Sequence, residues 1–214
     1  MKYGDLPKVI STNLQVDCKE MLFYQYLPIK LSNSSNIKYE KRLSVFDTLI
    51  NNCILDFNKT LNSFKEFEEY YIYLTVKHMY QLKNSSYNRT GYHSDGFLTN
   101  DINYIWSNIN PTVFNISDFD LTLDDKLSLI EMKDQANPQF DIMFANNTLL
   151  KLDQYNIHKV NDKIKEGMRT FFKLSFSKDK YDLIGNSHNY ELDYNWEMKE
   201  RQKERNIPQT KIQD

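Results

Sequence analysis

Residues 168–177 read MRTFFKLSFS, and the alternation of their side chains decides the predicted fold. In an extended strand, one face then carries Thr170, Phe172, Leu174 and Phe176, and the other carries Arg169, Phe171, Lys173 and Ser175. The first face is an apolar surface for packing between layers, and the second is predicted to point into a barrel. Because an unpaired arginine inside a barrel is costly, Arg169 needs an anionic partner, which is either a dianionic ligand or a structural Asp or Glu.

The segments before this strand predict a mainly β protein with helical support. Residues 69–81 (EYYIYLTVKHMYQ) are rich in β-branched and aromatic residues and apolar on both faces, which predicts a central strand. Residues 39–61 repeat their apolar positions every three or four residues, which predicts a helix packed against a sheet. Further short strands are expected at 22–27, 102–106, 112–114, 149–152 and 155–160, and Pro28 is expected to end the first of them.

The chain of 214 residues is long enough for one well-buried core and predicts a single domain. The core is expected at about 69–177, with 1–68 as N-terminal helical support. Residues 117–147 are acidic and irregular apart from a short helix at 127–132. Residues 193–214 are charged, which predicts a short exposed helix and then a flexible tail. We therefore expect an α+β architecture whose core is mainly β.

Charge and cysteine content bear on the class of protein. The 27 Lys and Arg residues nearly balance the 29 Asp and Glu residues, which argues against binding of duplex nucleic acid but leaves a nucleotide substrate open. Cys18 and Cys53 lie far apart in no metal-type spacing, which favours a reducing compartment over a disulfide framework. The N-terminus lacks an apolar signal region, and no apolar run approaches the about 18 residues of a membrane span. We expect a cytoplasmic protein.

Three residues form a candidate metal site. His93 and Asp95 are two positions apart in GYHSDGF, residues 91–97, so on a strand both side chains point to one face and can reach one ion. His158 lies in an apolar stretch, YNIHKV, after a long insert. Two imidazoles and one carboxylate are the facial triad of non-haem Fe(II) oxygenases, which leaves metal positions open for chemistry. The alternatives are a chance H-x-D pair and a strand histidine that hydrogen-bonds to the backbone.

The order His93-x-Asp95, then His158, then Arg169 resembles the pattern of the Fe(II)/2-oxoglutarate-dependent dioxygenase family over about residues 70–177. The resemblance implies a double-stranded β-helix, which is a jelly-roll or cupin-like fold, with N-terminal helices in support. It also implies Fe(II) as the metal and 2-oxoglutarate and O2 as co-substrates. In this family the arginine, here Arg169, holds the far carboxylate of 2-oxoglutarate.

By the same resemblance, a tyrosine from a neighbouring strand helps to hold that carboxylate, and Tyr80 and Tyr104 are the candidates. Two departures from the family leave the substrate open. The branch that repairs alkylated bases has a second arginine six residues after the first, where this chain has Ser175. Some small-molecule branches have a serine two residues after the arginine, where this chain has Phe171.

The expected activity is hydroxylation of a small polar molecule, a nucleotide or a protein residue, with release of succinate and CO2. Two other classes stay open: a catalytically inactive β-helix that acts as a binding or regulatory module, and a cupin-like metalloenzyme without 2-oxoglutarate, against which Arg169 weighs. The loops at 83–90 and 115–147 are the expected specificity elements, because loops on a rigid barrel carry recognition. His78 is expected to be structural, and His188 to lie in a loop beyond the core.

Overall fold

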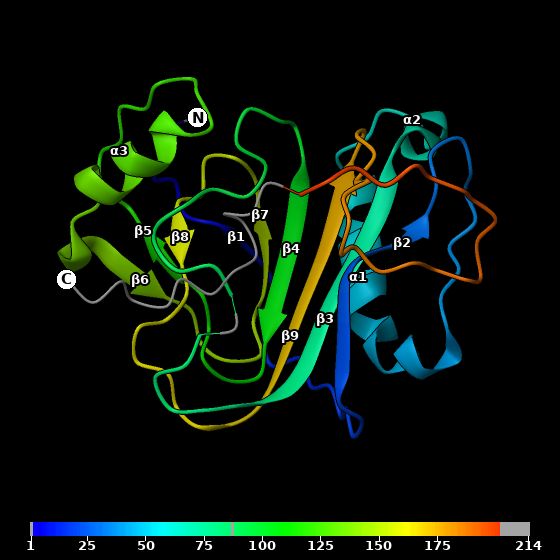
Figure 1. Ribbon diagram of the computed structural model, residues 1–214, viewed down its shortest axis with the longest axis horizontal. Helices are drawn as coiled ribbons and strands as arrows, with labels where there is room; N and C mark the ends of the chain where they lie inside the picture. Colours follow the sequence, from blue (N-terminus) through cyan, green and yellow to red (C-terminus); the bar gives the residue numbers. More distant parts are fainter. Residues whose placement is uncertain (1, 87, 202–214) are drawn as a thin grey trace.

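The computed structural model describes residues 2–86 and 88–201. Within them, six strands form one antiparallel sheet in the order β1-β7-β4-β9-β3-β2 (Figure 1). In that order the strands span Lys8–Ser11, Leu149–Leu152, Ile102–Ser107, Gly167–Ser177, Tyr71–Gln81 and Leu22–Lys30. The two long strands β9 and β3 pair along their whole length, from Tyr71 opposite Ser177 to Gln81 opposite Gly167. The prediction of a mainly β core is confirmed.

A second, smaller antiparallel sheet has the order β6-β5-β8 among the described residues. Its strands span Asp141–Met143, Val113–Asn115 and His158–Lys159. His93 extends this sheet through an isolated bridge to His158, with both backbone N–H···O=C distances at 2.9 Å. Phe114 of β5 lies in a buried cluster with Ile105 of β4 and Leu150 of β7. The small sheet therefore packs against the β4–β7 part of the large one.

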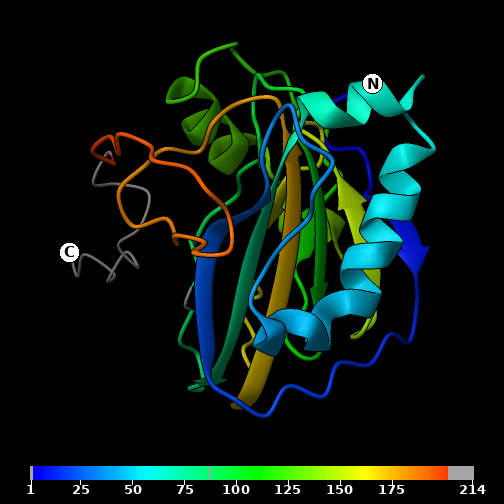
Figure 2. The same cartoon turned by 90° about the vertical axis from the view of Figure 1, so that its right-hand side faces the viewer.

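The other face of the large sheet is covered by helices (Figure 2). These are the 3-10 helix η1 (Lys41–Phe46), α1 (Asp47–Asn58) and α2 (Phe64–Glu69). The ring centroids of Phe46 and Phe172 are 6.0 Å apart, and those of Phe57 and Phe176 are 4.0 Å apart. All four residues of the predicted apolar face of β9 are buried. The apolar face is therefore confirmed, and so is the predicted helix at 39–61, which forms as η1 followed by α1.

The N-terminal part contributes strands as well as helices. Both β1 and β2 lie before residue 69, so the assignment of 1–68 to helical support was incomplete. In addition, β2 runs through Pro28, where the sequence predicts a break. Proline is tolerated there because β2 is an edge strand, whose pairing with β3 shifts on either side, between Tyr24 and Leu27 and between Pro28 and Lys30.

The segment at 117–147 contains more regular structure than predicted. Helix α3 spans Leu127–Gln135 and so extends the short helix predicted at 127–132. The Asp124 carboxylate accepts hydrogen bonds of 2.9 Å from two backbone N–H groups at the start of this helix, which satisfies donors that have no partner inside the helix. A 3-10 turn, η2 (Pro138–Phe140), then leads into β6.

After β9 the chain passes over the side of the large sheet that faces away from α1 (Figure 2). Leu183 forms a parallel bridge with Lys199. The helix predicted from Asp193 does not form in the part of the tail that the structure describes, and the rest of the predicted flexible tail, 202–214, lies outside the described residues. Among the described residues, no helix is both long and apolar enough to cross a membrane.

Candidate metal centre

The structure brings the three predicted metal ligands together. His93 lies in the bridge to β8, Asp95 follows it before β4, and His158 is the first residue of β8. The bridge places the two imidazole rings side by side, with centroids 4.5 Å apart. One ligand atom from each of the three residues lies within 4.8 Å of the other two. Ligand atoms about 2.0–2.2 Å from one ion are at most about 4.4 Å apart, so a small inward shift of these side chains would let them share one ion.

The backbone orients both imidazoles. His93 Nδ1 lies 2.9 Å from the carbonyl oxygen of Gly91, and His158 Nδ1 lies 2.9 Å from that of Asn156. Because a carbonyl oxygen only accepts, each Nδ1 is assigned as the donor, and each Nε2 keeps its lone pair. Such donation from the second ring nitrogen is the usual support of a metal-bound histidine. His158 Nε2 lies 3.6 Å from Asp95 Oδ2, so the ligand atoms face one another.

The charges around the triad suit a metal, which needs neutral imidazole and ionised carboxylate. Burial and the neighbouring His158 lower the pKa of His93 to about 3. Burial by itself raises the pKa of Asp95, but Lys173 and the two histidines hold it well below its usual range. The Lys173 ammonium lies 2.7 Å from Asp95 Oδ2. Burial lowers the pKa of Lys173, but Asp95 and Tyr26 raise it above its usual value. Lys173 is therefore charged and forms a buried ion pair with the candidate ligand.

The triad lines a cavity of about 730 Å³. Its walls come from both sheets and from the segment after β9, and include Thr75, Lys77, Asn103, Phe171 and Lys173 of the large sheet. Tyr181, in the segment after β9, stacks on Tyr73 with ring centroids 4.1 Å apart and donates a 2.6 Å hydrogen bond to Asp101 Oδ2. The cavity falls within the usual size range of small-molecule sites, about 300–1,000 Å³.

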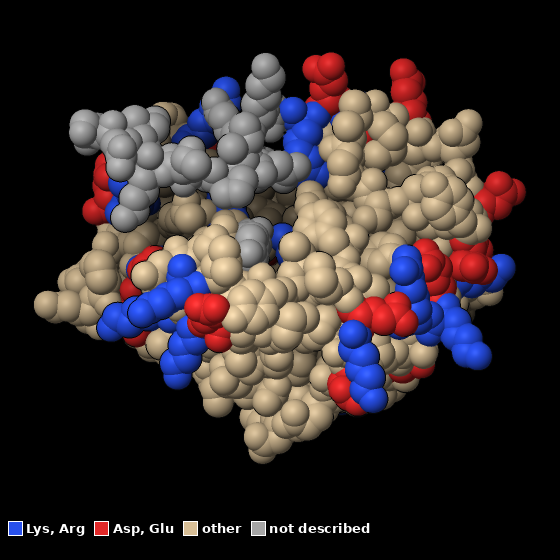
Figure 3. Space-filling view, turned by 60° about the horizontal axis from the view of Figure 1, so that its bottom comes forward, with Lys and Arg blue, Asp and Glu red and all other residues tan. Residues whose placement is uncertain are grey.

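The outer surface does not separate the charges by sign on the face shown in Figure 3. There, basic and acidic side chains stand beside one another around a largely uncharged surface. This agrees with the near balance of 27 basic and 29 acidic residues. The charges that line the cavity say more about a ligand, because a cation removed from water needs a compensating anion.

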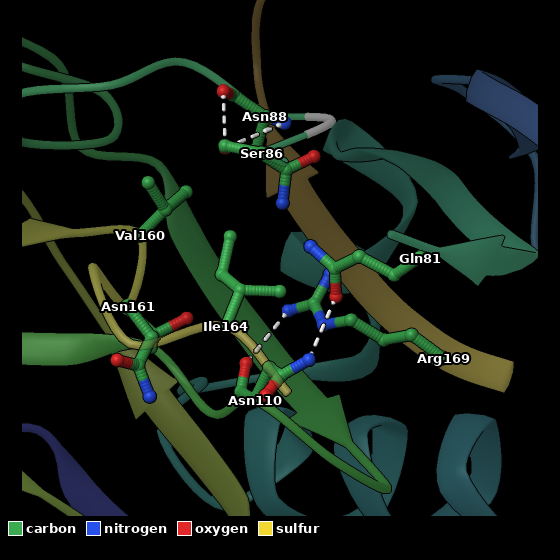
Figure 4. Close-up of a pocket in the computed structure, with 9 residues that line it drawn as sticks. Gln81, Ser86, Asn88, Asn110, Val160, Asn161, Ile164 and Arg169 are labelled. Carbon is green, nitrogen blue, oxygen red and sulfur yellow. Dashed lines mark hydrogen bonds between the residues drawn. The ribbon is translucent and has the colours of Figure 1, made fainter. Parts of the chain in front are cut away.

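Arg169 lies on the same face of β9 as Lys173, but it lines a small pocket beside the triad cavity (Figure 4). Its guanidinium donates to the carbonyl oxygens of Ile109 and Asn110, each at 3.2 Å. Its Cζ atom lies 5.0 Å from the centre of the Phe171 ring. Burial lowers the pKa of Arg169 to about 10. Among the described residues, no Asp or Glu forms an ion pair with Arg169, so the structural acidic partner considered above is not found there.

Tyr80 and Tyr104 do not line the cavity, so the structure does not bring these two predicted contacts to the triad. Tyr80 is 48% exposed and donates a 2.6 Å hydrogen bond to Glu166 Oε1. Tyr104 is fully buried on the helix-covered face, where it donates a 2.8 Å hydrogen bond to Asp56 Oδ2 of α1. Each tyrosine is an odd number of positions from the cavity-facing residues of its strand, and side chains alternate between faces.

Lys77 and Lys173 line the cavity, although the sequence analysis did not assign them to the site. The alternation of β9 indicates Lys173, because it shares a face with Arg169. Lys77 has a weaker signal, which is a lysine within a mostly apolar strand. His78 is buried, with Nδ1 2.8 Å from Thr170 Oγ1, which agrees with its predicted structural role.

No family model, curated protein or solved structure matches this chain.

Proposed function

We propose that this protein is an Fe(II)- and 2-oxoglutarate-dependent oxygenase that hydroxylates a polar substrate. The observation that carries the proposal is the convergence of His93, Asp95 and His158 in a cavity that is also lined by the buried Lys173 and the half-buried Lys77. Two imidazoles and one carboxylate leave about three positions on an octahedral ion. Two of these positions suit a chelating 2-oxo acid, and the third suits O2.

The path of the chain between the sheets supports a double-stranded β-helix. From β3 onward, β3, β4, β7 and β9 belong to the large sheet, while the His93 bridge, β5, β6 and β8 belong to the small one. The core of the large sheet has the order β7-β4-β9-β3, and the small sheet has the order β6-β5-β8 followed by His93. Two packed antiparallel sheets between which the chain crosses repeatedly are typical of jelly-roll folds. In this view β1 and β2 are additions at the edges.

Fe(II) bound at this site together with 2-oxoglutarate would supply the oxidation of a C–H bond by O2, with release of succinate and CO2. The chain supplies orientation. The backbone hydrogen bonds of His93 and His158 hold both Nε2 atoms toward Asp95. Lys173 donates to Asp95 Oδ2, the oxygen that also lies 3.6 Å from His158 Nε2, and so orients the carboxylate toward the histidines.

The charges in the site suit an anionic ligand. A divalent ion with one carboxylate ligand has a net charge of about +1, and Lys77 and Lys173 line the same cavity. Arg169 adds a further cation beside it. The two carboxylates of 2-oxoglutarate would offset part of this excess. The rest of the cavity of about 730 Å³ leaves room for a small polar molecule, a nucleotide or a protein side chain as substrate.

The Lys173–Asp95 contact favours a second candidate function, a binding or regulatory module without turnover. An ammonium group 2.7 Å from the carboxylate could take the place of the metal. The protein would then use the same cavity to bind an anionic ligand. This candidate predicts a protein that binds ligand without iron and releases no succinate.

Anaerobic titration of the Fe(II)-loaded protein with 2-oxoglutarate tests the oxygenase. The expected result is a weak visible charge-transfer band that Asp95→Ala lacks. Asp17→Ala, which removes a carboxylate that is 82% exposed, is the matched control. When O2 is admitted, the wild type and Asp17→Ala should release succinate and Asp95→Ala should not. If none of the three proteins gives the band or releases succinate above the background without protein, the oxygenase is rejected in favour of the binding module.

A further inference from the structure

Three cations lie on the cavity-facing side of the two central strands. Lys173 and Arg169 share a face of β9, and Lys77 of β3 stands directly opposite Phe171, the residue midway between them. Directly opposite residues of an antiparallel pair point to the same side of a sheet. The three cations are therefore arranged around Phe171 in the order Lys173, Lys77, Arg169.

The strand geometry gives the level of each cation. Positions are compared along the direction of strand β9. Lys173 is the reference point for the metal ligands, because its Nζ atom contacts Asp95 Oδ2 at 2.7 Å. Strand residues advance about 3.4 Å each, so Lys77 stands about 7 Å along the sheet from Lys173, and Arg169 about 14 Å. The terminal carbons of 2-oxoglutarate are about 5 Å apart, from four C–C bonds of about 1.5 Å each. A molecule of this length that extends along β9 from the triad therefore ends near Lys77 and does not reach Arg169.

The contacts of Lys77 and Arg169, the two cations farther from the triad, indicate different roles. The Arg169 guanidinium is turned to the carbonyl oxygens of Ile109 and Asn110, at the small pocket. Lys77 lines the triad cavity itself and donates a 2.7 Å hydrogen bond to Asn88 Oδ1. Burial, together with the charges of Arg169 and Lys173, lowers the pKa of Lys77 to about 8. An anion bound between these cations would stabilise the charged form of Lys77.

We propose that Lys77 is the residue that directly binds the far carboxylate of 2-oxoglutarate, with Arg169 as a supporting charge behind it. This inference rests on the proposed function. It changes the anchor expected from the sequence, because the direct contact comes from the first long strand, β3, and not from β9.

Calorimetric titration of the Mn(II)-loaded protein tests the inference without turnover. The two probes are 2-oxoglutarate and 2-oxovalerate, which has the same chain length but lacks the far carboxylate. Lys77→Met should bind 2-oxoglutarate about 10- to 150-fold more weakly, the range for loss of a hydrogen bond to a charged group. Its affinity for 2-oxovalerate should stay at the wild-type value. Lys77→Arg, which keeps the charge, should recover part of the loss.

Two controls keep the outcomes separate. Lys83→Met removes an exposed lysine just after β3 and should change neither affinity. Unchanged Mn(II) binding by Lys77→Met shows that the site is folded; if Lys77→Met does not fold, Lys77→Gln takes its place. If Lys77→Met binds 2-oxoglutarate as tightly as the wild type but Arg169→Met binds it more weakly, the inference is overturned and the oxygenase proposal stands. If the wild type binds Mn(II) but does not distinguish the two acids, the proposed function fails together with the inference.

Discussion

At the residue scale, the contact that decides the chemistry is the ion pair between Lys173 and Asp95. The Nζ–Oδ2 distance is 2.7 Å, and the two side chains are only 8% and 23% exposed. In this position Lys173 can orient Asp95 toward a metal or can substitute for the metal. The two roles predict opposite effects of removing the lysine.

We expect Lys173→Met to weaken Mn(II) binding about 10- to 100-fold, as is typical for loss of a residue that orients a metal ligand. Titration calorimetry with Mn(II) measures this change. Lys178→Met, which removes a lysine paired with Glu69 on the surface, should leave the affinity unchanged. Tighter Mn(II) binding by Lys173→Met would mean that the ammonium competes with the ion, and would favour the binding module.

At the element scale, β9 serves two purposes through its two faces. Phe172 is fully buried against the helices, while its neighbour Phe171 is partly buried at the cavity. The same strand therefore contributes to stability on one side and to the candidate site on the other. Adjacent phenylalanines with different environments allow the two contributions to be measured separately.

Phe172→Ala should lower the free energy of unfolding by about 3–5 kcal/mol, because it leaves a cavity in the core where Phe172 stacks with Phe46. Phe171→Ala should cost clearly less stability but should change the affinity for 2-oxoglutarate, because its ring lies among the three cations. Urea denaturation and calorimetry measure the two quantities. Equal stability losses would contradict the assignment of the faces.

At the scale of the whole molecule, the site exists only in the folded chain. His93 and Asp95 precede β4, whereas His158 lies on β8, and the bridge between His93 and His158 brings them together. An unfolded chain therefore offers no such group of three ligands. We therefore expect metal binding at this candidate site to be linked to folding.

Thermal and urea unfolding should show this linkage. Mn(II) at about 100 times its dissociation constant should raise the free energy of unfolding of the wild type by about 2.7 kcal/mol. Asp95→Ala should show no such increase, and a chelator should remove it from the wild type. Equal stabilisation of both proteins would place the metal elsewhere on the chain.

The sequence alone determined the local features that depend on side-chain periodicity. These are the apolar face of β9, the helix at 39–61 and the central strand at 69–81, whose patterns follow from the repeats of a strand and of a helix. The H-x-D pair and a second histidine were also readable, because both ligands of the pair lie within three residues.

Only the tertiary structure decided which side chains meet. The sequence does not distinguish Tyr80 and Tyr104 from residues that line the cavity. The pairing of β3, β9 and β4 places them on the other face of the sheet. The same pairing places Lys77 beside Phe171, and the fold places Lys173 against Asp95. The physical reason is that strand register and long-range pairing depend on the packing of the whole sheet, which no local pattern encodes.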